Sequence, residues 1–472
     1  MLKRVFSLLF CSVFVLSLWA GGKAKYVFYF IGDGMGVNQV NLTETYLAAL
    51  EGRIGIVPLT FADFPYAGLI NTFSATNGVT DSAASGTALA TGRKTKNHAL
   101  GLLPDLTTPA MSIAVGAKAA GARVGIATSV SVDHATPAAF YAHVPDRNSY
   151  HKIGGQLIDA GFDFYAGSDF RQPAADKAAG ETQSLFERAA SEGYAIVRGY
   201  DNYLKASPSA DRLILLQPEQ PSNADRTCLP YAIDRRDSDL TLTQITRAAI
   251  DRLSGSKQGF FLMVEGGKID YACHANDAAA VVHEVIDMDN AIREAFAFYE
   301  KHPKETLIVV TADHETGGLV LGRGPYELHT DLLRYQRMSA EEYTRHLNRL
   351  HADLGDKLTW ERMEADLREN WGFGAAVSLN DHQKERLHKA FDEFIAGRDK
   401  AKPNPSASLG GIADAARRTM AECALIGWQS GGHSNGYVPV FAVGVGAEQF
   451  VGRFDNTLIP AKIAAIAGWS VK

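Results

Sequence analysis

The chain contains six short runs of β-branched and aromatic residues, and these runs constrain its fold more than any other feature. Their almost uninterrupted apolar character is typical of strands buried on both faces of a sheet. Helical patterns separate most of them; residues 278–298, for example, place Val281, Val285 and Ile292 on one face. Alternating strands and helices predict an α/β fold with a largely parallel central sheet and helices on both faces. The predicted strands are residues 25–31, 123–128, 212–216, 259–264, 306–311 and 438–443.

Side chains that suit a divalent metal follow several of these strands. Asp33, Glu265 and Asp313 lie within two residues of a predicted strand end, and Thr136 follows the second strand. Because the carboxyl ends of parallel strands meet at one edge of a sheet, we expect these side chains to lie close together. The glycines around Asp33 allow a close approach to a ligand, although a tight turn with an Asp cap is the better explanation of that segment taken by itself.

A second group of residues has the spacing of zinc ligands. Asp270 and His274 are four residues apart, so one short helix can aim both at one ion, and His433 would complete three protein ligands. His314 directly follows Asp313. Each pattern is weak alone, because a strand-end Asp is often only a helix cap. Cys273, beside His274, is a conceivable thiolate ligand, but we interpret it as a small buried hydrophobe.

Ser82 begins a segment of very small residues that reads as a loop entering a tightly packed helix. Its hydroxyl and the first free backbone N–H groups of that helix would then face the same place and favour an anion there. The alternative is that Thr80, Asp81 or Ser82 merely caps the helix. Arg147 offers a planar fork of donors for phosphate oxygens, whereas a lone Arg after an Asp is more commonly a surface residue.

Charge and the N-terminus limit the partners and the location of the protein. The net charge of the 472-residue chain is −6, without a dense basic run, so a nucleic-acid-binding surface is not expected. Residues 1–22 have the charged, apolar and small-residue order of a secretory signal, and we expect removal near Gly22. A membrane anchor is the alternative, but its apolar stretch has about 15 residues where about 20 are needed. The mature protein, 23–472, is therefore predicted to be exported, without a transmembrane anchor, to the periplasm or the extracellular space.

The region from about 320 to 428 differs from the rest and reads as a mainly helical insertion on the rim of the sheet. Its predicted helices are residues 339–354, which open with a capping box from Ser339 to Glu342, and residues 380–396 and 411–426. A homodimer contact, a lid and a specificity rim are all open as its role. Cys228, Cys273 and Cys423 are too few for a disulfide framework and allow at most one bridge.

These segments, in this order, resemble the alkaline phosphatase family from about Tyr26 to Gly446, and residues 79–85 resemble its nucleophile segment almost residue for residue. The resemblance implies that Ser82 is the nucleophile that becomes phosphorylated and that Arg147 binds the phosphoryl oxygens. It also implies three metal sites. One zinc ion would be held by Asp270, His274 and His433, a second by Asp33, Asp313 and His314, and a magnesium ion by Asp33, Thr136 and Glu265.

Two positions depart from the best-known bacterial pattern of the family. His134 stands where that pattern has an Asp, and because imidazole suits zinc at least as well as magnesium, zinc is the alternative occupant of the third site. Tyr271 stands where the pattern has a Lys, which removes a positive charge near bound phosphate and predicts weaker product binding. Both side chains are candidates for contacts to the third site or to phosphate and its waters.

The expected function is therefore hydrolysis of small phosphate monoesters through a phosphoserine intermediate. A phosphodiesterase or sulfatase on the same scaffold is the nearest alternative. Relatives of those types resemble this chain less, because they place threonine or a modified residue at the nucleophile and often lack the third metal site. A non-catalytic protein that binds metal or phosphate is the remote alternative, since Ser82 and Arg147 accompany complete ligand sets.

Overall fold

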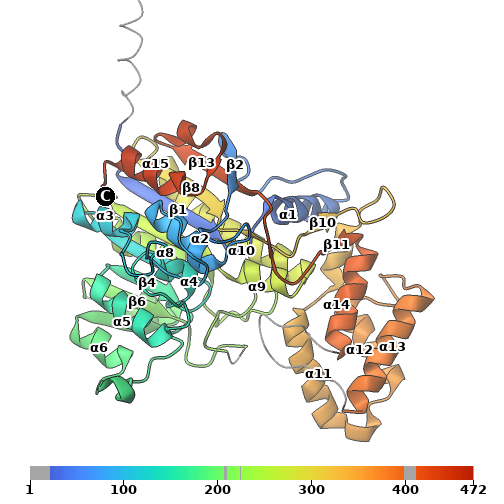
Figure 1. Cartoon of the computed structure of the whole chain (residues 1–472). Helices are drawn as coiled ribbons and strands as arrows, with labels where there is room; N and C mark the ends of the chain where they lie inside the picture. Colours follow the sequence, from blue (N-terminus) through green and yellow to red (C-terminus); the bar gives the residue numbers. More distant parts are fainter. Residues whose placement is uncertain (1–21, 207–209, 224, 398–410, 471–472) are drawn as a thin grey trace, which may run out of the picture.

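The computed structural model describes residues 22–206, 210–223, 225–397 and 411–470. Within these ranges ten strands form one twisted sheet at the centre of the main body (Figure 1). In sheet order they are β14 (Gly452–Asp455), β2 (Tyr66–Asn71), β13 (Val438–Gly444), β8 (Thr306–Ala312), β1 (Tyr26–Gly32), β7 (Phe260–Gly266), β3 (Arg123–Thr128), β4 (Phe164–Gly167), β6 (Arg212–Leu216) and β5 (Tyr194–Arg198). All pairs are parallel except those of β13, which runs antiparallel to β2 and β8.

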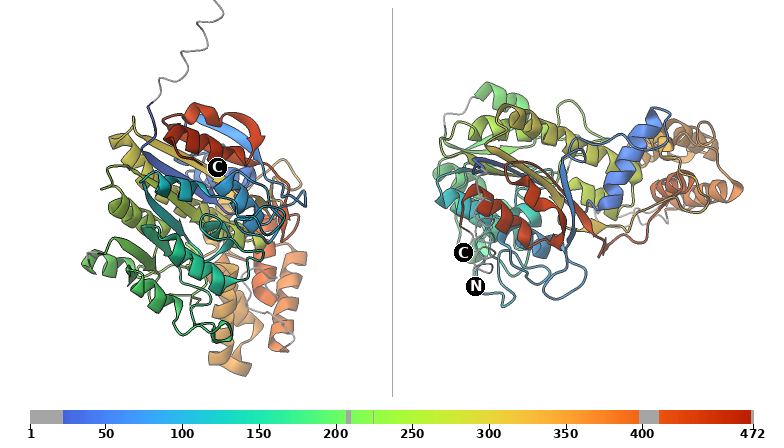
Figure 2. Two further views of the ribbon diagram at one scale, coloured as in Figure 1. Left: turned by 60° about the vertical axis from the view of Figure 1, so that its left-hand side comes forward. Right: turned by 90° about the horizontal axis from the view of Figure 1, so that it is seen from above.

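The sheet is buried on both faces, as the continuous apolar runs require. Every residue of the central strands β1, β7 and β8 is buried. One face is covered by α1 (Val37–Leu50), α8 (Leu242–Leu253) and α10 (Ala278–Lys301), and the other by α2 (Ser82–Thr91), α3 (Ile113–Ala119), α4 (Ala135–Ala138) and α15 (Leu458–Ala467) (Figure 2). This arrangement confirms the predicted α/β fold with a largely parallel sheet.

All six predicted strands occur, with ends within two residues of the predicted ones. Strands β2, β4, β5 and β14 were not predicted. The remaining helices of the main body are α5 (Tyr150–Ala160), α6 (Leu185–Ser191), α7 (Tyr200–Ala206) and α9 (Lys268–His274), with 3₁₀ turns η1 (Lys177–Ala179) and η4 (Ala447–Phe450).

The direction of β13 decides which residues reach the edge where the other strands end. Because β13 is antiparallel to β8, its beginning lies at the carboxyl edge of the parallel strands. The chain arrives there through β12 (His433–Ser434), which pairs with β9 (Glu315–Thr316), so His433 lies opposite Thr316. His433, which precedes β13, therefore lies at the same edge of the sheet as the residues that follow β1, β7 and β8.

In the described part of the chain between β10 (Val320–Leu321) and β11 (Ile426–Gly427), four helices form a group beside the sheet (Figure 1). They are α11 (Ala340–Leu354), α12 (Trp360–Trp371), α13 (Asp381–Ile395) and α14 (Gly411–Cys423), with 3₁₀ turns η2 (Thr330–Tyr335) and η3 (Gly355–Lys357). Strands β10 and β11 pair antiparallel at the base of the group.

Three details of this helical group differ from the sequence interpretation. The helix predicted to end at Ile426 ends at Cys423, and Ile426 instead begins β11. Helix α12 was not predicted. At the start of α11, Ser339 Oγ accepts from the Glu342 N–H at 3.1 Å, but the Ser339 N–H donates to Asp234 at 2.8 Å instead of to Glu342. Only half of the predicted capping box forms, because a carboxylate from the main body takes the other donor.

Within the described residues, no helix combines the length and the apolar character needed to cross a membrane. The predicted signal segment, except for Gly22, lies outside those residues.

Candidate active site

Three acidic or imidazole side chains meet at the ends of β1 and β8. Asp33 follows β1, and Asp313 and His314 follow β8; all three are completely buried. His314 Nε2 lies 3.3 Å from Asp33 Oδ1 and 3.4 Å from Asp313 Oδ2. Neither oxygen of Asp33 has a hydrogen-bond partner among the described residues. Three ligand-type groups converging on one point, with orphaned carboxylate oxygens, are what a divalent cation site provides.

The second group comes from α9 and from the strand that precedes β13. Asp270 and His274 lie on α9, and His274 Nε2 is 3.2 Å from Asp270 Oδ2. His433 Nε2 lies 3.2 Å from His274 Nε2 and 3.8 Å from Asp270 Oδ1. The predicted trio is therefore assembled at one point.

The other ring nitrogen of His274 and of His433, Nδ1, donates a hydrogen bond to a backbone carbonyl. Nδ1 of His274 bonds to the Gly431 carbonyl at 2.6 Å, and Nδ1 of His433 bonds to the Thr80 carbonyl at 2.8 Å. Because a carbonyl can only accept, both Nδ1 atoms carry a proton, and Nε2 is the ring atom of each histidine that can bind a metal ion. This outer hydrogen bond is the usual feature that orients metal-ligating histidines.

A third cluster lies on the other side of Asp33. Glu265, at the end of β7, and Thr136, in α4, are both completely buried, and Glu265 Oε1 and Thr136 Oγ1 lack hydrogen-bond partners within the described chain. His134 Nδ1 lies 4.0 Å from Glu265 Oε1 and is likewise unpartnered. Asp33, His134 and Glu265 together offer ligand atoms within 4.8 Å of one another. His134 therefore faces the same space as the predicted oxygen ligands.

Ser82 is the first residue of α2, and its side chain is buried beside the first cluster. Its Oγ lies 3.3 Å from His314 Nε2. The cap of this helix is Asp81, whose carboxylate accepts the Ala84 N–H at 3.0 Å. Asp81 therefore caps the helix in place of Ser82, and the Ser82 hydroxyl faces the ligand cluster.

Arg147 is not the surface residue that its sequence context allowed. Its Nη1 lies 3.2 Å from Asp81 Oδ2, and its Nη2 lies 3.3 Å from His134 Nε2. The guanidinium is thus held between the residue that precedes Ser82 and the third cluster. Tyr271 lies nearby, with its hydroxyl 3.5 Å from the same His134 nitrogen.

The carboxylates of the site repel one another strongly. Burial, reinforced by Asp270 and Glu265, raises the pKa of Asp313 to about 8, and burial raises the pKa of Glu265 to about 7. Burial and Asp313 also hold the pKa of Asp33 well above its usual value. Burial opposes protonation of His274, but the attraction of Asp270 outweighs it and raises the pKa to about 9. Such a cluster attracts cations, because protons or metal ions must offset its charge.

Comparison with known proteins identifies this arrangement. Residues 24–469 match the alkaline phosphatase family. The chain belongs to the alkaline phosphatase family. It is 29% identical to alkaline phosphatase 3 of Bacillus subtilis, over 95% of this chain and 90% of that protein. It is 31% identical to alkaline phosphatase 4 of the same bacterium, over 91% of this chain and 86% of the other.

Solved structures of alkaline phosphatases share the fold over nearly the whole length. The cold-active enzyme of Shewanella sp. matches with a TM-score of 0.78 and 29% identity, covering 94% of this chain and 99% of that one. The enzyme of Thermus thermophilus matches with a TM-score of 0.75 and 30% identity, covering 95% and 92%. Membership of the alkaline phosphatase family confirms the predicted hydrolase class and supports phosphate-monoester hydrolysis as the function.

Several residues that shape the site escaped the sequence analysis. The hydroxyl of Thr316 donates to Asp270 Oδ1 at 2.6 Å and lies 3.2 Å from His314 Nδ1, so it orients one residue from each of two clusters. Thr128 donates to Glu265 Oε2, and Asp81 holds Arg147. Hydroxyl and capping residues of this kind are common throughout the sequence, and only their spatial neighbours distinguish them.

The three cysteines do not take part in the clusters. Cys228, Cys273 and Cys423 are free thiols, and the first two are buried. Cys273 Sγ accepts a weak bond from Gln39 Nε2 at 3.8 Å and packs in the core, which agrees with the interpretation of a buried hydrophobe.

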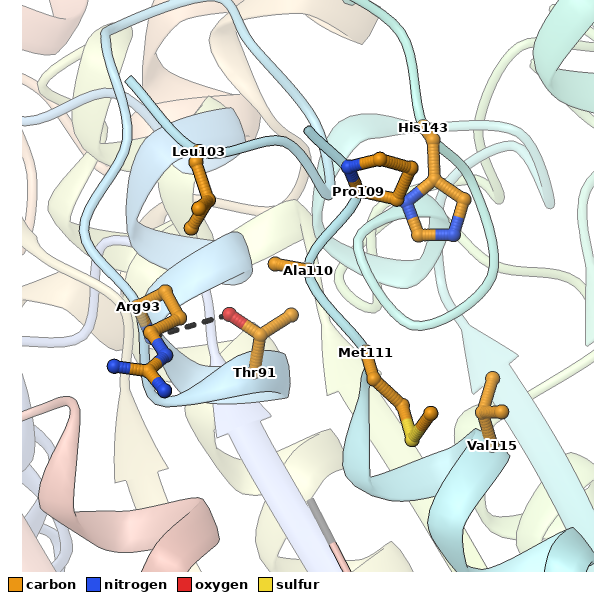
Figure 3. Close-up of a pocket in the computed structure, with 8 residues that line it drawn as sticks. All are labelled: Thr91, Arg93, Leu103, Pro109, Ala110, Met111, Val115 and His143. Carbon is orange, nitrogen blue, oxygen red and sulfur yellow. Dashed lines mark hydrogen bonds between the residues drawn. The ribbon is translucent and has the colours of Figure 1, made fainter. Parts of the chain in front are cut away.

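A cavity of about 570 Å³ lies at the other end of α2 from Ser82 (Figure 3). Its walls include Thr91 and Arg93 at the end of α2, Met111 and Val115 around the start of α3, and His143. Since Ser82 occupies the first position of the helix and Thr91 the last, this cavity is separate from the ligand clusters.

Proposed function

We propose that this alkaline phosphatase hydrolyses phosphate monoesters by transferring the phosphoryl group to Ser82 and then to water. The observation that carries the proposal is the position of Ser82 Oγ, 3.3 Å from His314 Nε2 and thus at the edge of the Asp33, Asp313 and His314 cluster. A serine hydroxyl that faces a divalent-cation site needs no histidine base, because the cation favours its deprotonated form.

The residues present fit three metal ions, and the orphaned oxygens of Asp33, Glu265 and Thr136 support that fit. In the proposed assignment Asp270, His274 and His433 hold one zinc ion, and Asp33, Asp313 and His314 hold the second. Asp33, Thr136 and Glu265 hold magnesium, or zinc if His134 Nδ1 joins them, because imidazole suits zinc well. Bound metals of this kind lower the pKa of coordinated hydroxyls and offset charge on phosphoryl oxygens.

Ser82 and Arg147 have different roles in the proposed reaction. Ser82 attacks phosphorus and the alcohol leaves on the opposite side; a water molecule later attacks the phosphoserine from the side that the alcohol vacated. Arg147, fixed by Asp81, donates to the phosphoryl oxygens, and the positive end of α2 faces the same group. Each in-line step inverts phosphorus, so the complete reaction retains its configuration.

Comparison of kcat/KM for a nitrophenyl monoester, the matching diester and the matching sulfate tests the reaction class. We expect the monoester to be preferred. A preference for the diester or the sulfate would overturn the proposal. Elemental analysis of the purified mature protein should find about two zinc ions and one further zinc or magnesium per chain, and activity that is independent of metal would contradict the mechanism.

The proposal extends to processing and domain organisation. We propose that residues 1–22 are a secretory signal and that residues 23–472 form one exported α/β domain, with residues 320–428 as its helical insertion. The charged, apolar and small-residue order of the N-terminus supports the signal. N-terminal sequencing of protein recovered from outside the cytoplasm should begin near Lys23, and an intact Met1 would contradict it.

A further inference from the structure

A second pocket, distinct from the metal-ligand clusters, lies where α14 meets the segment that leads to His433. Its volume is about 380 Å³. Three arginines line it: Arg417 and Arg418 from α14, and Arg323 from the segment after β10. Among the described lining residues Glu422 is the only carboxylate, and Arg386, outside the lining, pairs with it at 3.0 Å. Asp414, also outside the lining, pairs with both Arg417 and Arg418, so Arg323 and one further positive charge remain in excess. The pocket therefore has an excess of positive charge.

The pocket shares a wall with the proposed zinc site. Gly431 lines the pocket, and its carbonyl accepts the Nδ1 proton of His274 at 2.6 Å. The other nitrogen of that imidazole, Nε2, meets His433 and Asp270. One imidazole ring therefore separates the pocket wall from the point where the alcohol of a phosphate monoester would leave.

The same hydrogen bonds make this wall rigid. Asn276, two residues after His274, donates to the Ser430 carbonyl at 2.7 Å, and its own carbonyl accepts from Arg417 Nη1 at 3.2 Å. Through Asn276, Arg417 thus links the helical insertion to the backbone that follows His274 and to the backbone that precedes His433. The pocket is built from the segments that position two metal ligands, so its place relative to the site is fixed.

Two buried donors in the pocket lack acceptors in the part of the chain that the structure describes, although Arg417 and Arg418 also pair with Asp414. Arg417 is more than nine-tenths buried, and its Nε has no hydrogen-bond partner among the described residues; the indole N–H of Trp428, also in the lining, is buried and unpartnered in the same sense. Arg323, whose side chain is exposed, forms no ion pair within the described chain. Buried donors without acceptors are rare in folded proteins, so an anionic oxygen held in this pocket would meet donors that the described chain leaves unused.

We propose that this pocket binds a second anionic group on the leaving alcohol, so that the enzyme favours phosphate monoesters whose alcohol carries a further phosphate or carboxylate. The inference rests on the proposed function. Guanidinium groups match both oxyanions in a fork geometry, and Trp428 adds a donor and an aromatic face. The insertion would then act as a specificity rim, one of the roles that its sequence left open.

The test uses substrates that share one leaving-group ring and differ only in its distal substituent. Phenyl phosphate is compared with 4-carboxyphenyl phosphate and with 4-phosphonophenyl phosphate, whose phosphonate is not hydrolysed. We expect the wild-type protein to favour the anionic substrates over phenyl phosphate by about tenfold in kcat/KM, chiefly through KM, since the added contact is made in ground and transition states alike. The larger gain identifies carboxylate or phosphonate as the preferred group.

Arg323→Gln and Arg418→Gln remove pocket charge at exposed positions, so their folding should be intact, which the rate on phenyl phosphate checks directly. Each should lose about fivefold to tenfold on the anionic substrates and little on phenyl phosphate. Arg362→Gln is the matched control, because it makes the same charge change on α12 of the insertion at a residue outside the pocket lining.

The outcomes separate the two proposals. If the wild type hydrolyses phenyl phosphate but shows no preference for the anionic substrates, the inference is wrong and the proposed function stands. The same holds if Arg362→Gln reduces the preference as much as the pocket variants do, because the effect would then come from overall charge. If no monoester is hydrolysed, both proposals fail.

Discussion

Two buried threonines beside Glu265 allow the proposed third metal site to be tested through protein stability alone. Thr128 and Thr136 are both at most 1% exposed, and both lie close enough to Glu265 to lower the pKa of its carboxyl, against the larger effect of burial. Their hydrogen bonding differs. The Thr128 hydroxyl donates to Glu265 Oε2 and accepts from the Val130 N–H at 3.0 Å, whereas Thr136 Oγ1 has no partner in the described chain.

Replacement by valine keeps the shape of each side chain and removes only the hydroxyl. In metal-free protein, Thr136→Val removes a buried group that has already lost its hydration, so the free energy of unfolding should stay unchanged or rise by about 1 kcal/mol. Thr128→Val leaves the Glu265 oxygen and the Val130 N–H unpaired, and should lower the free energy of unfolding by about 1–3 kcal/mol.

Bound metal should reverse the effect of Thr136→Val on the free energy of unfolding. If Thr136 is a ligand, its loss weakens metal binding, and each tenfold loss of affinity removes about 1.4 kcal/mol of the stabilisation that saturating metal provides. Thr136→Val should therefore be as stable as the wild type, or more so, in the presence of a chelator, and less stable than the wild type when metal is present. Thr128→Val should be less stable in both conditions.

Urea unfolding of the three proteins, each with chelator and with saturating zinc and magnesium, provides the measurement. Elemental analysis of the same samples should show that Thr136→Val retains less of the third metal. Equal destabilisation by Thr136→Val with and without metal would refute the reasoning, because the hydroxyl would then have a partner within the protein itself.

Further predictions follow from other parts of the site. Ser82→Ala should lower kcat by at least about 10³-fold with its metal content unchanged, and undiminished phosphate release would exclude Ser82 as the nucleophile. Tyr271→Lys should strengthen inhibition by product phosphate, because it returns a cation beside His134; unchanged inhibition would contradict this. The pKa values of Asp313 and Glu265, about 8 and about 7, exceed those of unfolded carboxyls, so their contribution to stability is complete at acidic pH and is lost as pH rises through these values. Metal-free protein should therefore become less stable between about pH 5 and pH 8, and a rise in its urea midpoint over that range would contradict the prediction.

The sequence predicted the three central strands of the sheet. It missed β2 and β14 at one margin, β5 at the other, and the interior strand β4, which is fully buried but only four residues long. Strands β1, β7 and β8 are buried on both faces and read as continuous apolar runs. Strand β2 alternates between partly buried and exposed residues, with Ile70 alone fully buried, and includes Gly68, while β14 has no fully buried residue and carries Arg453 and Asp455. Such strands bury too little apolar surface to leave a distinct pattern. Helix α12 buries Met363, Leu367 and Trp371 at regular spacing, but charged residues between them obscured it.

The candidate ligands could be predicted because strand ends converge, yet their orientation could not. The order of the strands predicted that Asp33, Thr136, Glu265 and Asp313 meet at one edge, and spacing suggested Asp270, His274 and His433 as zinc ligands. The resemblance then assigned these residues to three sites. Nothing in a linear pattern indicates that the Thr316 hydroxyl bonds to Asp270, or that Asp81 caps α2 and holds Arg147 at the same time. These contacts join residues far apart in the sequence, so they become visible only after folding.

The antiparallel direction of β13 connects the fold to the specificity that we infer for the insertion. A parallel strand would have its beginning at the opposite edge, and His433 could not then reach Asp270. Because the chain must return to the carboxyl edge before β13, the segment after α14 passes directly beside the ligands. The β10 and β11 pair closes the base of the insertion, so its length can change without moving His433. Chains with this topology can therefore vary the residues that face the leaving group while the metal ligands stay in place.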